Sequence, residues 1–174
     1  PFTVNTDDVT IKGITANRFS DNSVTVQNNA NNVIITGNYF GVGTDGVTDY
    51  GNDDFGVVIW SGSNITIGGS AAADRNIISG SGSHGINSTG ITGLTAQGNY
   101  IGVGADGTTG VGNGGVGVLA VGNTSTQIGG NTATESNVIS SNGKGVSIEG
   151  SGSASNVISG NRIVTNAAGT ADLG

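Results

Sequence analysis

The residues best suited to chemistry in this chain are the carboxylates of one glycine-rich segment. Gly41–Asp54 has the sequence GVGTDGVTDYGNDD and holds Asp45, Asp49, Asp53 and Asp54. Carboxylate oxygens are the ligands that Ca²⁺ prefers in proteins. The segment is therefore a candidate calcium loop, and turn formation by its Asp-Gly pair is the alternative.

A related segment later in the chain indicates which features belong to the pattern. Gly102–Gly115 has the sequence GVGADGTTGVGNGG and retains only Asp106 and Asn113 of the polar positions. Both segments keep the Asp-Gly pair, which is typical of a tight turn. We therefore expect turn formation in both segments and restrict the calcium prediction to the first.

Groups that could act as catalytic acids, bases or nucleophiles are scarce elsewhere. The chain has one His, five Lys and Arg together, and no Cys, which excludes thiol catalysis, disulfides and zinc thiolate sites. A single His does not complete a convincing Ser-His-Asp set. No glycine-rich stretch opens a helix, so the glycines do not form phosphate loops. We therefore predict no catalytic residues and no cofactor beyond the candidate Ca²⁺.

The composition also restricts partners and location. The net charge is −7, so the chain lacks the basic stripe that nucleic acids require. No apolar run approaches the roughly 20 residues that span a bilayer, so we expect no membrane insertion. Charged residues make up only 10% of the chain, and Gly, Asn, Ser and Thr are abundant. This composition is similar to that of bacterial extracellular proteins, and we expect an extracellular or cell-surface location.

The elements that position these residues form an internal repeat. Asn38 recurs as Asn99, 61 residues later (99 − 38), and Gly68-Gly69 recurs as Gly129-Gly130 at the same offset. A third copy begins near NVISGNRI, at Asn156–Ile163. Such a period is too long for one coil of a solenoid, so we interpret it as two coils.

Three short strand signals recur in every coil. The three series are Val24, Val57, Ile86, Val118 and Val146; Ile35, Ile67, Ala96, Ile128 and Ile158; and Phe40, Ile78, Ile101, Ile139 and Ile163. An incomplete coil over Val9–Phe19 precedes them, which gives about six coils. Long loops alternate between coils. Gly41–Asp54 and Gly102–Gly115 follow the third strand, and Gly68–Arg75 and Gly129–Ser136 lie between the second and third strands of the other coils.

Such short strands become stable only by stacking. They cannot bury enough area alone, and no i, i+3, i+4 pattern predicts helices. Gly and Asn at the corners supply positive φ angles, and parallel stacking favours right-handed winding. We therefore predict an all-β protein with one domain over residues 1–174, a single-stranded right-handed parallel β-helix. Its first two series face inward, and Asn38, Asn99 and Asn161 stack and hydrogen-bond at one corner.

The repeated segments resemble a known family. GNYIGVGADG, GVGVLAVGN and NVISGNRI resemble the right-handed parallel β-helix repeats of the pectin-lyase-like superfamily. More narrowly, they resemble the tandem GNYIG…GN…GV repeats of large bacterial secreted and surface proteins. The resemblance covers nearly the whole chain and implies the fold. It does not imply one activity, because this fold hosts many functions.

Polygalacturonases of this superfamily use an Asn-Thr-Asp segment, an Asp pair, a Gly-His-Gly segment and an Arg-Ile-Lys segment. The chain offers partial counterparts in the same order, at Asn5–Asp8, Asp53-Asp54, Ser83–Gly85 and Arg162–Val164. Glycoside hydrolysis requires carboxyl groups about 5–10 Å apart. The first and last counterparts would lie about five coil rises, or roughly 24 Å, apart. Lyases and epimerases of this fold use clustered acids with a Lys or Arg base, and we find no such cluster. We therefore predict that the chain is not an enzyme.

A sugar-stacking face is a further possibility that the sequence leaves open. Its candidates are Tyr39, Tyr50, Phe55, Trp60 and Tyr100. Tyr39 and Tyr100 fall at one repeat position two coils apart, which favours a stacked wall over a binding platform. Ice or mineral binding by a flat Thr/Asn face is disfavoured, because the outward rows are not regular threonine ladders.

The dispersed reactive groups favour a structural role. We predict a non-catalytic structural or adhesive module that stacks end-to-end, on its own copies in a filament or on neighbouring repeats of a longer chain. A carbohydrate-binding or polysaccharide-modifying β-helix is the alternative. Terminal coils of a solenoid need caps, and we expect the polar tail Val164–Gly174 to be a weak cap at best.

Overall fold

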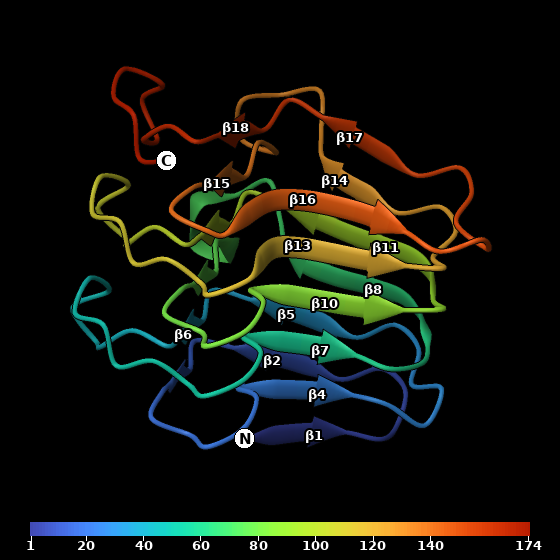
Figure 1. Ribbon diagram of the computed structural model, residues 1–174. Coiled ribbons are helices and arrows are strands. Elements are labelled where there is room, and N and C mark those ends of the chain that lie inside the picture. The colour runs from blue at the N-terminus through green and yellow to red at the C-terminus, as the bar shows by residue number, and fades with distance from the viewer.

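Three parallel β-sheets wind around a common axis in the computed structural model, which describes all 174 residues. Six coils stack from the N-terminus to the C-terminus, and each coil gives one strand to each six-stranded sheet (Figure 1). The strands of the front sheet run to the right, and those of the sheet behind it run back to the left as the chain climbs. The winding is right-handed, and the predicted parallel β-helix is confirmed.

We name the sheets A, B and C in the order in which each coil enters them. Sheet A contains β1 (Phe2–Val4), β4 (Val24–Val26), β7 (Val57–Ile59), β10 (Ile86–Thr89), β13 (Val116–Val121) and β16 (Lys144–Glu149). Sheet B contains β2 (Thr10–Lys12), β5 (Ile34–Thr36), β8 (Ser63–Gly68), β11 (Thr92–Gln97), β14 (Gln127–Gly129) and β17 (Val157–Ser159). Sheet C contains β3 (Thr15–Ala16), β6 (Tyr39–Phe40), β9 (Ile77–Ile78), β12 (Tyr100–Ile101), β15 (Val138–Ile139) and β18 (Arg162–Ile163).

The register places equivalent residues of successive coils directly over one another. In sheet B, Ile35 pairs with Ile67, and Ile128 pairs with Ile158. The two other predicted series pair in the same way in sheets A and C. A slip of one residue would turn each inward side chain to the other face, so burial of these columns fixes the register.

The first coil is complete, and the expectation of an incomplete coil over Val9–Phe19 is wrong. β1 pairs with β4 in parallel, with Phe2 opposite Val24. The three residues of β1 carry too short a pattern to predict a strand by themselves. Pairing with the strand above supplies the stability that the local sequence lacks.

The core is a column of aliphatic side chains inside the coils. Ile35, Ile67, Ile86 and Ile128 are fully buried, and β-branched residues of this kind suit pleated strands. The one helical element is a short 3-10 turn, η1 (Ala72–Asp74), between β8 and β9. The structure contains no helix with the length and hydrophobicity that crossing a membrane requires.

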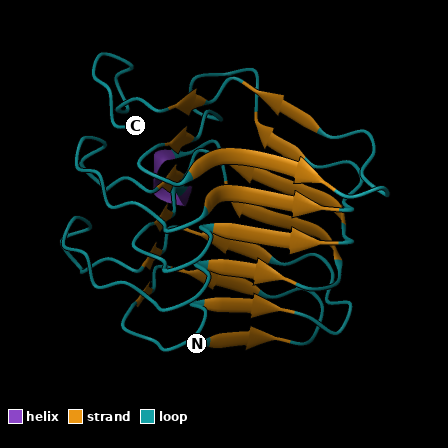
Figure 2. Cartoon of the chain, in the orientation of Figure 1, coloured by secondary structure: helices purple, strands orange, loops and turns teal.

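Long hairpin loops leave alternate coils on one side of the molecule (Figure 2). The first two are the predicted loops after β6 and β12, each with one antiparallel bridge. A third hairpin follows β18, with a bridge between Thr165 and Asp172. The tail Val164–Gly174 is therefore a third copy of the loop, and it leaves Ile158 and Ile163 of the last coil exposed, as expected of a weak cap. Its substitutions hide the Asp-Gly signal of the other copies.

The three hairpins form a continuous column. The Ala105 N–H donates to the Gly46 carbonyl oxygen at 2.9 Å, and the Ala167 N–H donates to the Gly107 carbonyl oxygen at 2.8 Å. Each bond joins loops that belong to coils two steps apart. The column therefore ties the coils together outside the sheets.

Glycine is required where the first two hairpins begin. Gly41 and Gly102 have φ values of +77° and +80°, and a Cβ on them would lie 1.9 and 2.1 Å from the carbonyl oxygens of Ser79 and Ser140 in the next coil. The positive φ and the close approach both exclude other side chains. The third hairpin has Val164 at this position, with a φ of +68°.

Candidate functional site

The acidic segment folds into the first hairpin, and its carboxylates hold the backbone of the loop. Asp45 Oδ1 accepts hydrogen bonds from the N–H groups of Val47 and Thr48 at 3.1 and 3.0 Å. The Thr48 hydroxyl also donates to Asp45, and this bond is the largest cause of the lowered pKa of Asp45. Asp49 Oδ1 accepts from the Gly51 N–H at 3.0 Å. These contacts are those of a turn.

Asp106 makes the equivalent contacts in the second hairpin. Its Oδ1 accepts from the N–H groups of Thr108 and Thr109 at 2.9 Å each, and both hydroxyls donate to its Oδ2. Burial acts to raise the pKa of Asp106, but the hydrogen bonds from Thr109 and Thr108 outweigh it and lower the pKa to about 2. The turn-forming role predicted for the Asp-Gly pairs is confirmed.

The four candidate calcium ligands do not form one group. Asp45 and Asp49 bond within the hairpin, Asp53 is exposed, and Asp54 interacts instead with Asp21 and a histidine of the next coil. No three His, Asp or Glu side chains in the structure lie close enough together to hold a metal ion. Calcium binding by this loop stays a prediction of the sequence alone, which the hydrogen bonds of its carboxylates do not favour.

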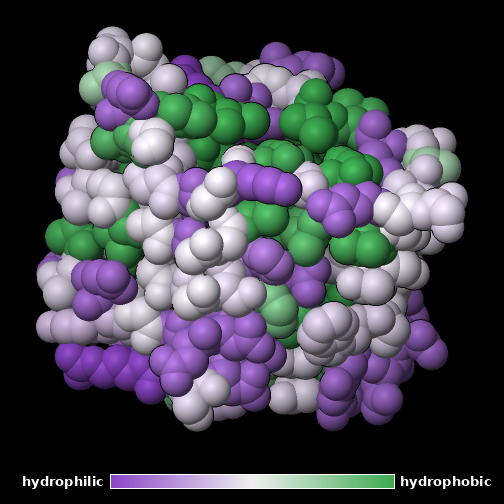
Figure 3. Space-filling view, viewed as in Figure 1, coloured by the Kyte–Doolittle hydropathy of each residue, from purple (hydrophilic) through white to green (hydrophobic).

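Aromatic side chains gather where the chain enters and leaves β7, on the outer side of sheet A. The ring centroids of Phe55 and Trp60 lie 6.1 Å apart in an edge-to-face arrangement, and those of Phe55 and His84 lie 5.5 Å apart. Between them the outward-facing Val58 is fully buried, whereas Trp60 is 47% exposed. This side of sheet A faces the viewer in Figure 3, where hydrophobic residues are densest toward the C-terminal end.

The fold favours the neutral form of His84. Its Nδ1 accepts a hydrogen bond from the Val116 N–H at 2.8 Å, so this nitrogen carries no proton. Burial lowers the pKa of His84, and the carboxylates of Asp54 and Glu149 act in the opposite direction. Burial and the negative charge of Asp21 raise the pKa of Asp54. Asp54 and His84 therefore influence each other's pKa and are the candidate acid–base pair of this site.

The other residues of the glycosidase comparison are not part of this pair. Asp7 lies in the first coil, where its Oδ1 accepts from the Asn31 N–H at 2.8 Å. Arg162 lies in β18 of the last coil, and its Nη1 donates to Ser136 at 3.4 Å. The fold brings Asp54 near the His84 ring but leaves Asp7 and Arg162 in the end coils, as the coil count predicts.

The tyrosines lie apart from the aromatic cluster of sheet A. Tyr39 and Tyr100 are half-buried in sheet C, where they pack beside the hairpins against a small second core of Val42, Ile77 and Val111. Arginine side chains stack on two of the tyrosine rings. The Arg18 Cζ lies 3.9 Å from the Tyr50 centroid, and the Arg75 Cζ lies 4.1 Å from the Tyr100 centroid. The five aromatic residues proposed as one sugar-stacking face are therefore divided between two sides of the molecule.

One asparagine from each coil except the first stacks at the corner between sheets B and C. In every asparagine of this column except the uppermost, the side-chain Nδ2 donates to Oδ1 of the asparagine above, at 2.8–3.1 Å. The same Nδ2 donates to a backbone carbonyl of the coil below. We call this column the first asparagine ladder, and its members are Asn38, Asn76, Asn99, Asn137 and Asn161.

Only three of these asparagines, Asn38, Asn99 and Asn161, were predicted at this corner from the sequence. Asn76 and Asn137 were missed because the excursions Gly68–Arg75 and Gly129–Ser136 alter the spacing within each coil. A signal for both exists, since each begins the repeated pattern Asn-Ile/Val-Ile-Ser directly after its excursion. The predicted hydrogen bonding at this corner is confirmed, with neighbours one coil apart.

A second asparagine ladder lies at the corner between sheets C and A, and it has a gap. Asn113 Nδ2 donates to Asn142 Oδ1 at 2.8 Å, and the N–H groups of Phe19 and Ser81 donate to Oδ1 of Asn52 and Asn113. Ser81 occupies the third-coil position of this ladder. Its hydroxyl is buried and has no hydrogen-bond partner.

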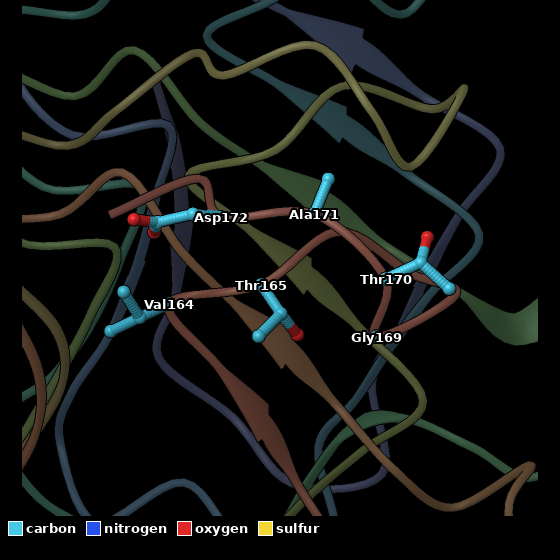
Figure 4. Close-up of a pocket in the computed structure, with 6 residues that line it drawn as sticks. All are labelled: Val164, Thr165, Gly169, Thr170, Ala171 and Asp172. Carbon is cyan, nitrogen blue, oxygen red and sulfur yellow. The ribbon is translucent and has the colours of Figure 1, made fainter.

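The last coil leaves aliphatic side chains uncovered. Ile158 and Ile163 are 48% and 38% exposed, whereas Ile128 and Ile139, one coil below, are 0% exposed. A shallow pocket adjoins this end, inside the third hairpin (Figure 4). Its lining residues are Val164, Thr165, Gly169, Thr170, Ala171 and Asp172.

Comparison of the chain with models of protein families, with curated proteins and with solved structures finds no match.

Proposed function

We propose that this chain is a non-catalytic structural or adhesive β-solenoid module of a secreted or cell-surface protein. The observation that carries the proposal is the use of its asparagines, whose amide groups bond from coil to coil through the stack. The stability of such a stack is approximately the sum of its coil and interface terms, so the module can serve as a spacer or stalk. The low charge and the abundance of Gly, Asn, Ser and Thr support the extracellular location.

Polysaccharide turnover tests this proposal directly. The purified protein is incubated with polygalacturonate and alginate, and reducing ends and unsaturated uronate absorbance are followed. We expect no turnover above that of an Asp54→Asn, His84→Asn double variant. Turnover that the double variant loses would overturn the proposal. Immunodetection of the native protein in surface and medium fractions tests the location, and its confinement to the cell interior would contradict that part.

Carbohydrate binding is the second candidate, because the aromatic side chain of Trp60 is exposed on the outer side of sheet A. Trp60 is 47% exposed, and Phe55 holds it edge-on. Aromatic rings in this state present an apolar surface with little rotamer entropy to lose on binding. A glycan array with the parent chain and Trp60→Ala tests this candidate. Signals that Trp60→Ala abolishes would support it, and equal signals from both proteins would exclude this face.

A further inference from the structure

Most wall side chains at the N-terminal end of the solenoid are covered by their own coil, although Phe2, which pairs with the fully buried Val24, is 38% exposed. Val4, Ile11 and Ala16 of the first coil are only 3–6% exposed, although no coil lies below them. Apolar corner residues of the same coil pack against the core beside them, namely Val9, Ile14 and Phe19. Two of these corners hold asparagine in higher coils. The first coil therefore covers most of its own lower side.

The C-terminal end is built as an interior coil. Its wall residues Ile158 and Ile163 align with fully buried isoleucines of the coil below, yet they are 48% and 38% exposed. A corner of this coil keeps the polar Asn161 that interior coils carry. Covering these side chains with another coil would remove apolar surface from water, which is favourable.

The first asparagine ladder shows the same polarity. At its lower end, the Ile14 N–H donates to Asn38 Oδ1 at 3.0 Å and closes the ladder. At its upper end, Asn161 Nδ2 donates to the Ile128 carbonyl, but its second N–H and its backbone N–H have no partner in the protein. In the lower coils both groups donate to the asparagine above. The partner missing at Asn161 is therefore an asparagine Oδ1 one coil higher.

We infer that the C-terminal face binds a further coil of the same repeat, one that supplies an asparagine above Asn161 and apolar side chains above Ile158 and Ile163. This inference rests on the structural function proposed above and names its partner. The coil-to-coil interface that it continues already occurs five times in the stack. The N-terminal coil of a second copy fits less well, because its Ile14 would stand above Asn161 and offer no side-chain acceptor.

Val164 opposes this contact at one corner. It stands where Gly41 and Gly102 meet carbonyl oxygens of the coil above, and its φ is similarly positive. A carbonyl of a further coil in the same register would lie about 2 Å from its Cβ, as it would at those glycines. We therefore expect the further coil to pair with sheets A and B and to extend the asparagine ladder. At the end of β18, the side chain of Val164 prevents the same close contact.

The test extends the full chain after Gly174 with a copy of its own Asn113–Ser140, because Gly174 occupies the repeat position of Gly112. Amide hydrogen exchange is compared between the extended and unextended chains. We expect exchange of the Asn161 N–H to slow by roughly tenfold or more, with protection of the copied sheet A and B strands. Protection near the copied Ser140 should appear only when Val164→Gly is added.

A matched control carries isoleucine in place of the copied Asn137, the residue type that the first coil offers at this corner. It should keep the copied strands protected and lose the slowing at Asn161. The inference is overturned if the copied residues exchange at the rate of an unfolded chain both with Val164 and with Val164→Gly. It is also overturned if the unextended chain self-associates in sedimentation and the extension abolishes this association, since the face then binds a second copy. Both outcomes leave the structural function standing, because only polysaccharide turnover removes it.

Discussion

Val164 and Gly102 occupy equivalent positions, and swapping their residue types should change the free energy of unfolding in opposite directions. A β-branched residue at a φ of +68° costs on the order of 1–2 kcal/mol. Val164→Gly should therefore raise the free energy of unfolding, by about 1 kcal/mol after the added entropy of the unfolded chain is subtracted. Gly102→Val should lower it by about 3 kcal/mol or more, because its Cβ would lie 2.1 Å from the Ser140 oxygen. Urea unfolding followed by Trp60 fluorescence measures both, and an unchanged midpoint for Val164→Gly would contradict the strain.

His84 should make stability depend on pH near neutrality. Burial lowers its folded pKa below the unfolded value of 6.5, so between the two values the unfolded chain binds more protons and stability rises with pH. Its contribution is present above pH 6.5 and is lost as the pH falls through the folded value. The melting temperature should therefore fall as the pH is lowered from 7.5 to 5.5. Protonation of Nδ1 also breaks its hydrogen bond from the Val116 N–H.

The control for this pH effect is His84→Asn, whose side-chain oxygen can accept from the same N–H without titrating in this range. The neighbouring Asp21, Asp54 and Glu149 remain in both proteins, so the difference between the two profiles isolates the imidazole. Parallel profiles for the parent and the variant would show that His84 is not the titrating group.

At the scale of elements, the gap in the second asparagine ladder can be filled. Ser81→Asn places an Oδ1 above Asn52, whose backbone N–H has no partner, and an Nδ2 near the carbonyls of the coil below. We expect a gain of about 1 kcal/mol in the free energy of unfolding. Asn113→Ser copies the gap one coil higher and should cost about 1–3 kcal/mol. A Ser81→Asn variant less stable than the parent would show that this corner lacks room for the amide.

Calcium should leave the first hairpin unaffected. Both oxygens of Asp45 already accept hydrogen bonds within the loop, and Asp54 interacts with His84 instead. We therefore expect the same melting midpoint in millimolar calcium and in chelator, since only a ligand that binds the folded state raises it. A rise that Asp45→Asn removes would establish the calcium loop that the sequence suggests.

The strands were easier to predict from the sequence than the site. Columns such as Ile35 to Ile158 follow from a spacing of about one coil, because each inward position must be apolar. Asn76 was missed because a loop of variable length precedes it, although the coil closes at the same corner. The contact between Phe55 and His84 could not be predicted from the sequence, because it depends on the register in which successive coils stack. The acidic loop shows the reverse case, because its carboxylates are close in sequence but have separate partners: Asp45 and Asp49 bond within the hairpin, and Asp54 interacts with His84.

At the scale of the whole molecule, equal substitutions in adjacent coils should differ in cost. Ile128→Ala removes a fully buried side chain and should lower the free energy of unfolding by about 3 kcal/mol. Ile158→Ala lies directly above it, is 48% exposed and should cost about 1 kcal/mol or less. Urea unfolding at micromolar protein concentration measures both. Equal costs would show that something already covers the last coil in solution.

The hairpin column has a consequence for how this molecule changes length during evolution. A loop reaches its neighbour only across two coils, since Ala105 meets Gly46 and Ala167 meets Gly107. Insertion of a single coil would put every later loop out of phase and break one of these bonds, whereas duplication of a 61-residue unit keeps them all. Viable relatives of different length should therefore differ by whole pairs of coils, each adding about 10 Å.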